Sequence, residues 1–169
     1  MIRRPIVAVA LTVCCVCAAG AACGKDKKNS ENSLLELRPV LSSSAPPCPA
    51  KAPKKSELVV PKTTDGKVDE CLELGPAIID AKDVRSATEG ETTSKEPTIF
   101  IVLGGVGGAN LDGFAQRNLG KRLAIMADGQ LVNAPEVRYS SFAGRIQITG
   151  LSKEKTDDLF RRLDALIKS

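Results

Sequence analysis

The sequence predicts an α+β domain in which two helices pack on one face of a mainly antiparallel sheet, in the order β-β-β-α-β-β-β-α. The first observation is Asp128-Gly129 between two apolar runs, because this dipeptide favours a two-residue hairpin turn in which both residues have positive φ. The second is the β-branched and aromatic run Thr98–Leu103, which predicts a central strand buried on both faces. The third is apolar residues at helical spacing, once after this run and again near the end of the chain.

The composition excludes several classes of site. The 169 residues are enough for one domain of ordinary size. The absence of histidine rules out Ser-His-Asp and Cys-His catalysis, imidazole zinc ligands and a histidine pH switch. A net charge of only +4 and 3% aromatic residues give little support to binding of nucleic acid.

Residues 1–22 have the features of a lipoprotein signal peptide. Two arginines precede an uncharged run, Pro5–Ala22, whose end is crowded with small residues before Cys23. This arrangement resembles the lipobox of bacterial lipoproteins, in which the cysteine is acylated and becomes the first residue, although Gly20 departs from the family's usual aliphatic residue. We therefore expect lipidation at Cys23; the alternative is an uncleaved signal anchor, because a run of this length can almost span a bilayer. Both place the rest of the chain on the extracytoplasmic face of the cell membrane.

Residues 23–56 are expected to form a lipid-anchored tether. Gly24–Ser33 is polar and charged without apolar periodicity, and Ser42–Ser56 is rich in Pro, Ser and Lys. Both compositions are typical of an extended chain that does not pack by itself. Leu34–Leu41, between them, is a short apolar island that is compatible with one strand.

The cysteines predict one disulfide. Of the six, three lie in the signal peptide and Cys23 is assigned to the lipid, so Cys48 and Cys71 remain. Two remaining cysteines in an oxidising compartment usually pair. We therefore expect a Cys48–Cys71 disulfide, the alternative being two reduced thiols.

Residues 57–169 form the predicted globular domain, and its first strands precede the first helix. Cys71–Leu74 and Asp83–Thr88 are short strands separated by the turn-like Gly75-Pro76, and Thr98–Leu103 follows them. A glycine-rich stretch, GGVGG, then ends this strand. The helix after it is expected to have Asn110 as its N-cap.

The first helix should carry Leu119 on its apolar stripe and end at Gly120. The last helix should begin after Ser152 as N-cap and place Leu159 and Leu163 on one stripe. These two helices supply the layer that covers the sheet.

The hairpin and a further strand lie between the helices. If Ala127 faces Gln130 across the turn, then Ile125 faces Val132 and Leu123 faces Ala134. Because side chains alternate along a strand, these last four residues are predicted to share one apolar face of the hairpin. Arg145–Thr149 is the strand that follows.

Several of these segments resemble a known family. Glu73–Ala87, Lys121–Pro135 and Gly144–Leu159 are together similar to the head subdomain of the first extracytoplasmic domain of SecD, the accessory membrane subunit of the bacterial preprotein translocase. The LGP element, the Asp-Gly hairpin followed by Ala-Pro, and the strand ending in Ile-Thr-Gly before a helix occur in the family's order. The island LELRPVL also resembles the approach to this domain in actinobacterial SecD proteins. The resemblance covers roughly Leu34 to Leu166 and implies the fold and contact with emerging polypeptide.

The chain also departs from the family. SecD continues into transmembrane helices that couple export to proton flow, whereas this chain ends at Ser169, and most of the base subdomain that precedes the head is missing. The resemblance therefore implies no proton-driven pumping by this chain.

Catalytic and nucleotide sites find little support. GGVGG lacks the last glycine of a dinucleotide fingerprint, since Asn110 stands there, and Arg122 stands where a P-loop needs Ser or Thr after Gly-Lys. The candidate catalytic acids are Asp128, which the hairpin turn already explains, and Glu136, which lies just beyond Pro135. Ser140-Ser141, the candidate nucleophile, lacks a general base and a nucleophile elbow. We therefore expect no enzyme, no nucleotide or other cofactor, and no metal.

The binding candidate is Val137–Ala143, which contains the chain's one tyrosine, Tyr139, together with Phe142 and Arg138. An exposed aromatic loop or strand edge can bind extended chains through main-chain hydrogen bonds. In the alternative, Tyr139 and Phe142 cover the rim of a core that is short of aromatic residues.

The sequence thus predicts a binding module that contacts exported polypeptides or components of the Sec translocase. We expect the chain from residue 24 onward to bind unfolded polypeptide weakly and without a cofactor. One alternative is an envelope lipoprotein, structural or interacting, that keeps only the fold, since fold does not fix function. An undetected hydrolase is the other alternative.

Overall fold

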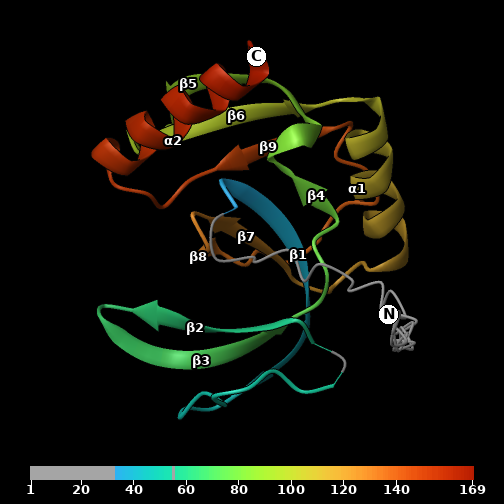
Figure 1. Cartoon of the computed structure of the whole chain (residues 1–169), viewed down its shortest axis with the longest axis vertical. Helices are drawn as coiled ribbons and strands as arrows, with labels where there is room; N and C mark the ends of the chain where they lie inside the picture. The colour runs from blue at the N-terminus through green and yellow to red at the C-terminus, as the bar shows by residue number, and fades with distance from the viewer. Residues whose placement is uncertain (1–32, 55) are drawn as a thin grey trace, which may run out of the picture.

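The computed structural model describes residues 33–54 and 56–169 (Figure 1). Cys23 and the predicted signal peptide lie outside the described residues. The elements, in chain order, are β1 (Leu35–Ser44), β2 (Leu58–Thr64), β3 (Lys67–Leu74), β4 (Ile79–Asp80), the 3-10 helix η2 (Ala81–Asp83), β5 (Val84–Glu91), β6 (Pro97–Leu103), α1 (Gly105–Arg117), β7 (Leu123–Ala127), β8 (Gln130–Asn133), β9 (Arg145–Ile148) and α2 (Lys153–Ile167).

The strands form two antiparallel sheets. The larger has the order β2-β3-β1-β7-β8, with β4 also paired to β1, and the smaller has the order β5-β6-β9. The predicted α+β class is confirmed. The sequence did not predict that the strands divide between two sheets, and β9 in particular joins β6 rather than the hairpin that precedes it.

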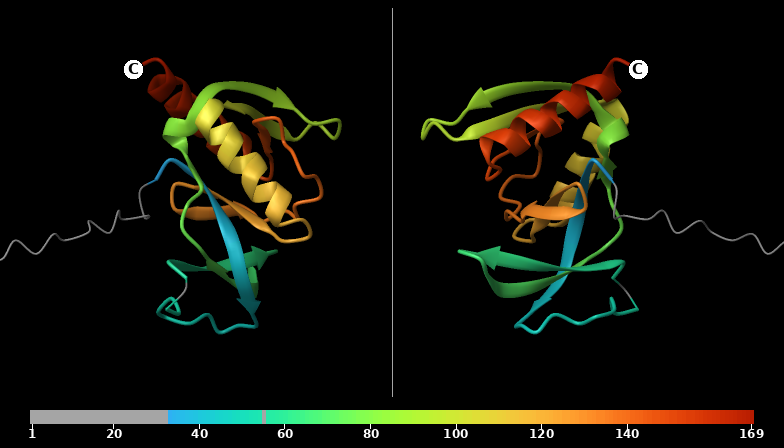
Figure 2. Two further views of the ribbon diagram at one scale, coloured as in Figure 1. Left: turned by 90° about the vertical axis from the view of Figure 1, so that its right-hand side faces the viewer. Right: turned by 60° about the vertical axis from the view of Figure 1, so that its left-hand side comes forward.

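The two sheets and two helices enclose one main core. In Figure 1, α2 lies over the small sheet, where it contacts β5 and β6, and α1 closes one side of the molecule against β4 and β6. The core contains residues from all these layers, such as Leu35, Ile101, Leu111 and Leu159, each at most 2% exposed. The large sheet is bent so that the β2–β3 hairpin faces the β7–β8 hairpin (Figure 2). A second, smaller core, which includes Leu72 and Met126, lies between these two hairpins.

The predicted tether, residues 23–56, is wrong in its middle part, because Leu35–Ser44 forms strand β1 of the domain. The island expected there forms the middle of the large sheet, with β7 on one side and β3 and β4 on the other. Leu35 and Leu37 are buried in the main core, and Arg38 pairs with Glu36 at 2.6 Å and donates to the Gly75 carbonyl at 2.9 Å. The sequence did not predict that Leu34–Leu41 belongs to the folded domain, because the strands that pair with it lie far away in sequence.

The predicted hairpin turn is present, but its register changes after two pairs, Ala127 with Gln130 and Met126 with Leu131. Asp128 and Gly129 have φ of 50° and 72°, and Ala127 pairs with Gln130. A bulge then sets Ile125 opposite Asn133, so the predicted facing of Ile125 with Val132 is wrong. The predicted pairing of Leu123 with Ala134 is wrong as well, since Leu123 belongs to the main core and Ala134 packs against the smaller core.

Strand β6 is central in its sheet but is buried on one face only. Ile99 and Ile101 are 0% and 1% exposed, whereas Phe100 and Val102 are 43% and 38% exposed. The main core covers one side of the small sheet, so the expected burial of both faces is wrong.

Helix α1 begins at Gly105, within the glycine-rich stretch, so Asn110 is not its N-cap. The glycines are required by close packing: a Cβ on Gly107 would lie 2.7 Å from the Asp83 Cβ, and one on Gly108 would lie 3.3 Å from the Gly144 Cα. Helix α2 begins as predicted, with the Ser152 hydroxyl accepting from the Lys155 amide at 3.4 Å.

Cys48 and Cys71 are joined by a disulfide with a Cα–Cα distance of 5.3 Å. Cys71 is buried in β3, whereas Cys48 belongs to the Pro-rich segment after β1. The bond therefore fixes that segment to the large sheet.

Candidate functional site

The candidate binding segment, residues 137–143, is fixed to the fold at its first residue. Val137 is 1% exposed; its amide donates to the Lys121 carbonyl at 2.8 Å, and its carbonyl accepts from the Gly120 amide at 2.9 Å. These bonds place the start of the segment against the stretch that follows α1.

Asp112 of α1 holds the far end of the same segment. Its Oδ1 accepts from the Phe142 amide at 2.7 Å, and its Oδ2 accepts from the Ser141 hydroxyl at 3.1 Å. The Ser141 hydroxyl in turn accepts from the Ala143 amide at 3.1 Å. One carboxylate thus orders three consecutive residues.

The turn after this contact is equally constrained. Ala143 and Gly144 have φ of 51° and 64°, a backbone conformation that favours glycine, and a Cβ on Gly108 would lie only 3.3 Å from the Gly144 Cα. The loop therefore enters β9 along one defined path.

Tyr139 and Phe142 have different environments. Phe142 is half-buried and packs against the main core, so it fits the alternative in which the ring covers the rim. Tyr139 is 72% exposed and is flanked by exposed Arg138 and Ser140. Of the three predicted binding residues, two are therefore presented to solvent.

Leu119 is a surface residue that the sequence analysis missed. It was expected on the buried stripe of the first helix, but α1 ends at Arg117, and the Asn118 side chain caps the Phe114 carbonyl at 2.8 Å. Leu119 is consequently 54% exposed. Since Gly120 is bonded to Val137, Leu119 and Tyr139 lie on neighbouring backbone segments; the Asn-Leu-Gly sequence was the available signal for an earlier helix end.

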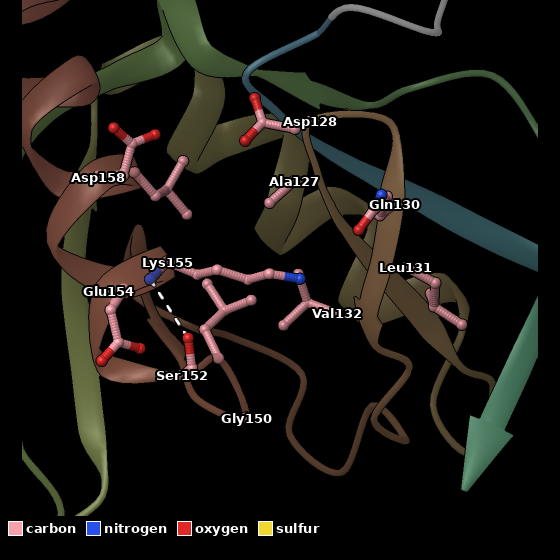
Figure 3. A pocket seen from close by; sticks show the side chains of 12 residues that line it. Ala127, Asp128, Gln130, Leu131, Val132, Gly150, Ser152, Glu154, Lys155 and Asp158 are labelled. Carbon is pink, nitrogen blue, oxygen red and sulfur yellow. Dashed lines mark hydrogen bonds between the residues drawn. The ribbon is translucent and has the colours of Figure 1, made fainter. Parts of the chain in front are cut away.

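A cleft of about 530 Å³ opens elsewhere, between the β7–β8 hairpin and the first turns of α2 (Figure 3). Its apolar lining includes Val132, Leu151 and Leu159, and the Lys155 side chain extends across it toward Val132.

Arg162 pairs with two of the carboxylates that line the cleft, Asp128 and Asp158. Its guanidinium lies 2.7 Å from the Asp128 carboxylate and 3.3 Å from that of Asp158, and these contacts raise the pKa of Arg162 above its ordinary value. Both carboxylates are about half exposed. The cleft therefore does not hold a pair of buried, converging acids, the arrangement that would favour general acid–base catalysis.

The remaining candidate groups are dispersed. The main chain of Glu136 forms an isolated antiparallel β-bridge with that of Arg122, and the Ser141 hydroxyl donates a hydrogen bond to the Asp112 carboxylate. In the part of the chain that the structure describes, no cluster of three or more His, Cys, Asp or Glu side chains could hold a metal ion. Within that part, no helix is long and apolar enough to cross a membrane.

The fold and this surface define a small α+β domain that presents apolar side chains on an ordered loop. Comparison with known families identifies the domain more closely, because the family model of the SecDF P1 head subdomain matches residues 58–165. The chain belongs to this family.

Individual relatives are longer proteins. The chain is 35% identical over 86 residues to the protein translocase subunit SecD of Aquifex aeolicus, covering 51% of this chain and 17% of the relative. It is 30% identical over 81 residues to SecD of Treponema pallidum, covering 48% and 14%. The matched part is thus less than a fifth of either relative.

Solved structures agree on the fold. A structure of SecDF, a membrane component that enhances protein export, superposes with a TM-score of 0.58 at 21% identity, over 78% of this chain and 62% of that chain. SecDF in a super-membrane-facing form gives a TM-score of 0.57 at 20% identity, over 81% and 19%.

Proposed function

We propose that this protein is a lipid-anchored, extracytoplasmic module that binds exported polypeptides in extended form, without pumping or catalysis of its own. The family supports a role in protein translocation, because the named relatives are translocase subunits. Lipidation at Cys23 and a position on the outer face of the cell membrane belong to this proposal.

The observation that carries the proposal is the exposure of Tyr139 and Leu119 on ordered, adjacent backbone. Single exposed apolar residues are common on protein surfaces. Here, however, the two side chains are 72% and 54% exposed on segments joined by the hydrogen bonds of Val137, with Arg138 beside them. A ring with a polar tip and a branched aliphatic chain suit contact with apolar side chains of many sequences.

Strand β9 supplies a main-chain surface next to this loop. Among the described strands it pairs with β6 alone. The Leu103 amide donates to the Gly144 carbonyl at 2.8 Å, so in an antiparallel ladder the alternate residue Gln147 directs its main-chain groups away from β6. An extended segment can add along this edge, which would give binding that depends little on sequence.

The test is binding of reduced, carboxymethylated α-lactalbumin, a permanently unfolded probe, to the full-length protein in detergent. We expect weak binding, because ordering a flexible chain costs free energy that a small interface offsets only in part. The double variant Tyr139→Ser/Leu119→Ser should bind at least fivefold more weakly, on the order of 1 kcal/mol, with an unchanged melting temperature. Val106→Ser is the matched control, since Val106 is 75% exposed at the start of α1 and lies outside the proposed surface.

Phe142→Ser should behave differently from Tyr139→Ser. Phe142 packs against the main core, so its replacement should lower the melting temperature, whereas Tyr139→Ser should not. If the wild-type protein binds no unfolded probe, direct polypeptide binding is wrong. Crosslinking in intact cells with mass spectrometry of the partners would then separate docking to the translocase from an envelope role.

A further inference from the structure

We propose that Asp112 is a positioning residue that holds Tyr139 in place for contact with a polypeptide ligand. This inference rests on the proposed function, because it assigns Asp112 a role at the same surface. Asp112 itself is only partly exposed and lies on α1, whereas the side chain that it positions lies on the loop before β9.

The geometry limits the free part of the loop to three residues. Val137 is bonded to Gly120 and Lys121 on one side, and Asp112 holds Ser141 and Phe142 on the other. Only Arg138, Tyr139 and Ser140 lie between these two attachments, and all three are exposed. A side chain on such a short span has few positions available, so little freedom remains to be lost when a ligand binds.

Removal of the Asp112 carboxylate would lengthen this free span. The Phe142 amide and the Ser141 hydroxyl would lose their acceptor, and the next attachment would be at Ala143–Gly144, where Gly144 packs on Gly108. Phe142 would keep its apolar contacts, so the variant is expected to fold while Tyr139 becomes more mobile.

The chain provides a direct measurement of this mobility. It has one tyrosine and no tryptophan, so the intrinsic fluorescence of the full-length protein comes from Tyr139 alone when it is excited for tyrosine. Fluorescence anisotropy therefore reports on the motion of Tyr139, and a role of Asp112 in general stability alone would leave it unchanged in the folded protein.

The experiment compares full-length wild type with Asp112→Ala, Asp112→Asn and Asp157→Ala. Asp112→Ala should lower the anisotropy and weaken binding of the α-lactalbumin probe about threefold, or about 0.65 kcal/mol, which is less than the loss expected when Tyr139 and Leu119 are both removed. Asp112→Asn keeps an acceptor for the Phe142 amide and should restore most of both signals. Asp157→Ala removes a helix carboxylate that pairs with Lys153 on α2, at 3.1 Å, and should change neither signal.

Each result decides one part of the inference. Unchanged anisotropy in Asp112→Ala would refute the positioning role whatever the binding result. Lower anisotropy with unchanged binding would show that a fixed Tyr139 is not needed by the ligand, which also refutes the inference. Absence of binding by the wild type would overturn the proposed function and, with it, the role toward a ligand. If Asp112→Ala does not fold, Ser141→Ala removes one of the two bonds to Asp112, together with the acceptor of the Ala143 amide, and should lower the anisotropy to a smaller extent.

Discussion

Reduction of the Cys48–Cys71 disulfide should destabilise the protein without changing its fold. The bond joins the Pro-rich segment after β1 to the buried strand β3 and closes a loop with a sequence separation of 23 residues. Reduction is a cleaner perturbation than substitution, because it leaves both side chains in place and creates no cavity at Cys71, which is 0% exposed.

The expected loss follows from the length of this loop. In the chain-entropy model, a crosslink that closes a loop of this size removes unfolded-state entropy worth about 3.4 kcal/mol at 25 °C. With a urea slope of about 2 kcal/mol per M, the midpoint of unfolding should fall by about 1.7 M on reduction. The slope should stay the same or rise slightly, since the reduced unfolded chain is less compact and exposes more surface.

The assay is urea unfolding of the full-length protein in detergent, with and without a thiol reductant, after peptide mapping has shown that the starting protein is oxidised. The Cys48→Ser variant serves as a control, because its midpoint should not respond to the reductant. A midpoint that is the same in both redox states would refute the loop argument. Peptide mapping that finds both thiols free in protein prepared from its native compartment would refute the disulfide itself.

Three further perturbations test other features. Cys23→Ala should abolish acylation and processing of residues 1–22; an unchanged lipid mass in the variant would refute the anchor. Arg38→Met removes the guanidinium that pairs with the buried carboxylate of Glu36, and it should lower the free energy of urea unfolding by about 3 kcal/mol. Glu36→Met in the same chain should recover part of this loss. A loss below about 1 kcal/mol in Arg38→Met would contradict the argument. The Arg122 guanidinium, which donates to Glu70 at 2.8 Å, holds the pKa of that carboxyl below its ordinary value of 4.5. The contribution of the ionised Glu70 carboxylate to folding stability should therefore be complete above pH 4.5 and disappear as the pH falls through its lower folded pKa. Glu70→Gln should be less stable than wild type at pH 7 and as stable as wild type in strong acid. A difference in stability that persists in strong acid would refute this.

Local signals in the sequence predicted local structure well. The Asp128-Gly129 turn and the Ser152 cap are present because each is set by the conformational preferences of a few adjacent residues. The bulge that sets Asn133 opposite Ile125 was not predictable in the same way. Val132 is the extra residue of the bulge and packs against the main core, whereas Ala134 beyond it packs against the smaller core, and both contacts depend on partners that are distant in sequence.

Features that depend on distant partners were missed or displaced. Strand β1 has ordinary apolar residues inside a low-complexity region, and only the pairing with β7 and β3 makes it central. Gly107 and Gly108 disfavour a helix locally, yet α1 includes them. Glycine stands at these positions because a Cβ on Gly107 would lie 2.7 Å from the Asp83 Cβ and one on Gly108 would lie 3.3 Å from the Gly144 Cα.

The candidate surface was predicted in part. Sequence indicated Arg138 and Tyr139 because the only tyrosine stands beside a cation, and both are exposed. For Leu119 the signal was the Asn-Leu-Gly sequence, which marks the earlier end of the helix. Asp112 carried no signal, because its role depends on Phe142, thirty residues away, in a loop that returns to α1.

If Cys23 carries the lipid anchor proposed above, the start of β1 at Leu35 sets how far the domain can move from the membrane. A tether that ended at Glu57 would give a lipid at Cys23 a reach of about 120 Å, whereas a chain that enters the sheet at Leu35 reaches at most about 40 Å. With the anchor proposed here, the volume open to the domain is a thin layer next to the bilayer. A polypeptide that emerges within this layer would meet the exposed Tyr139 at a high effective concentration, which would allow a weak surface to remain occupied.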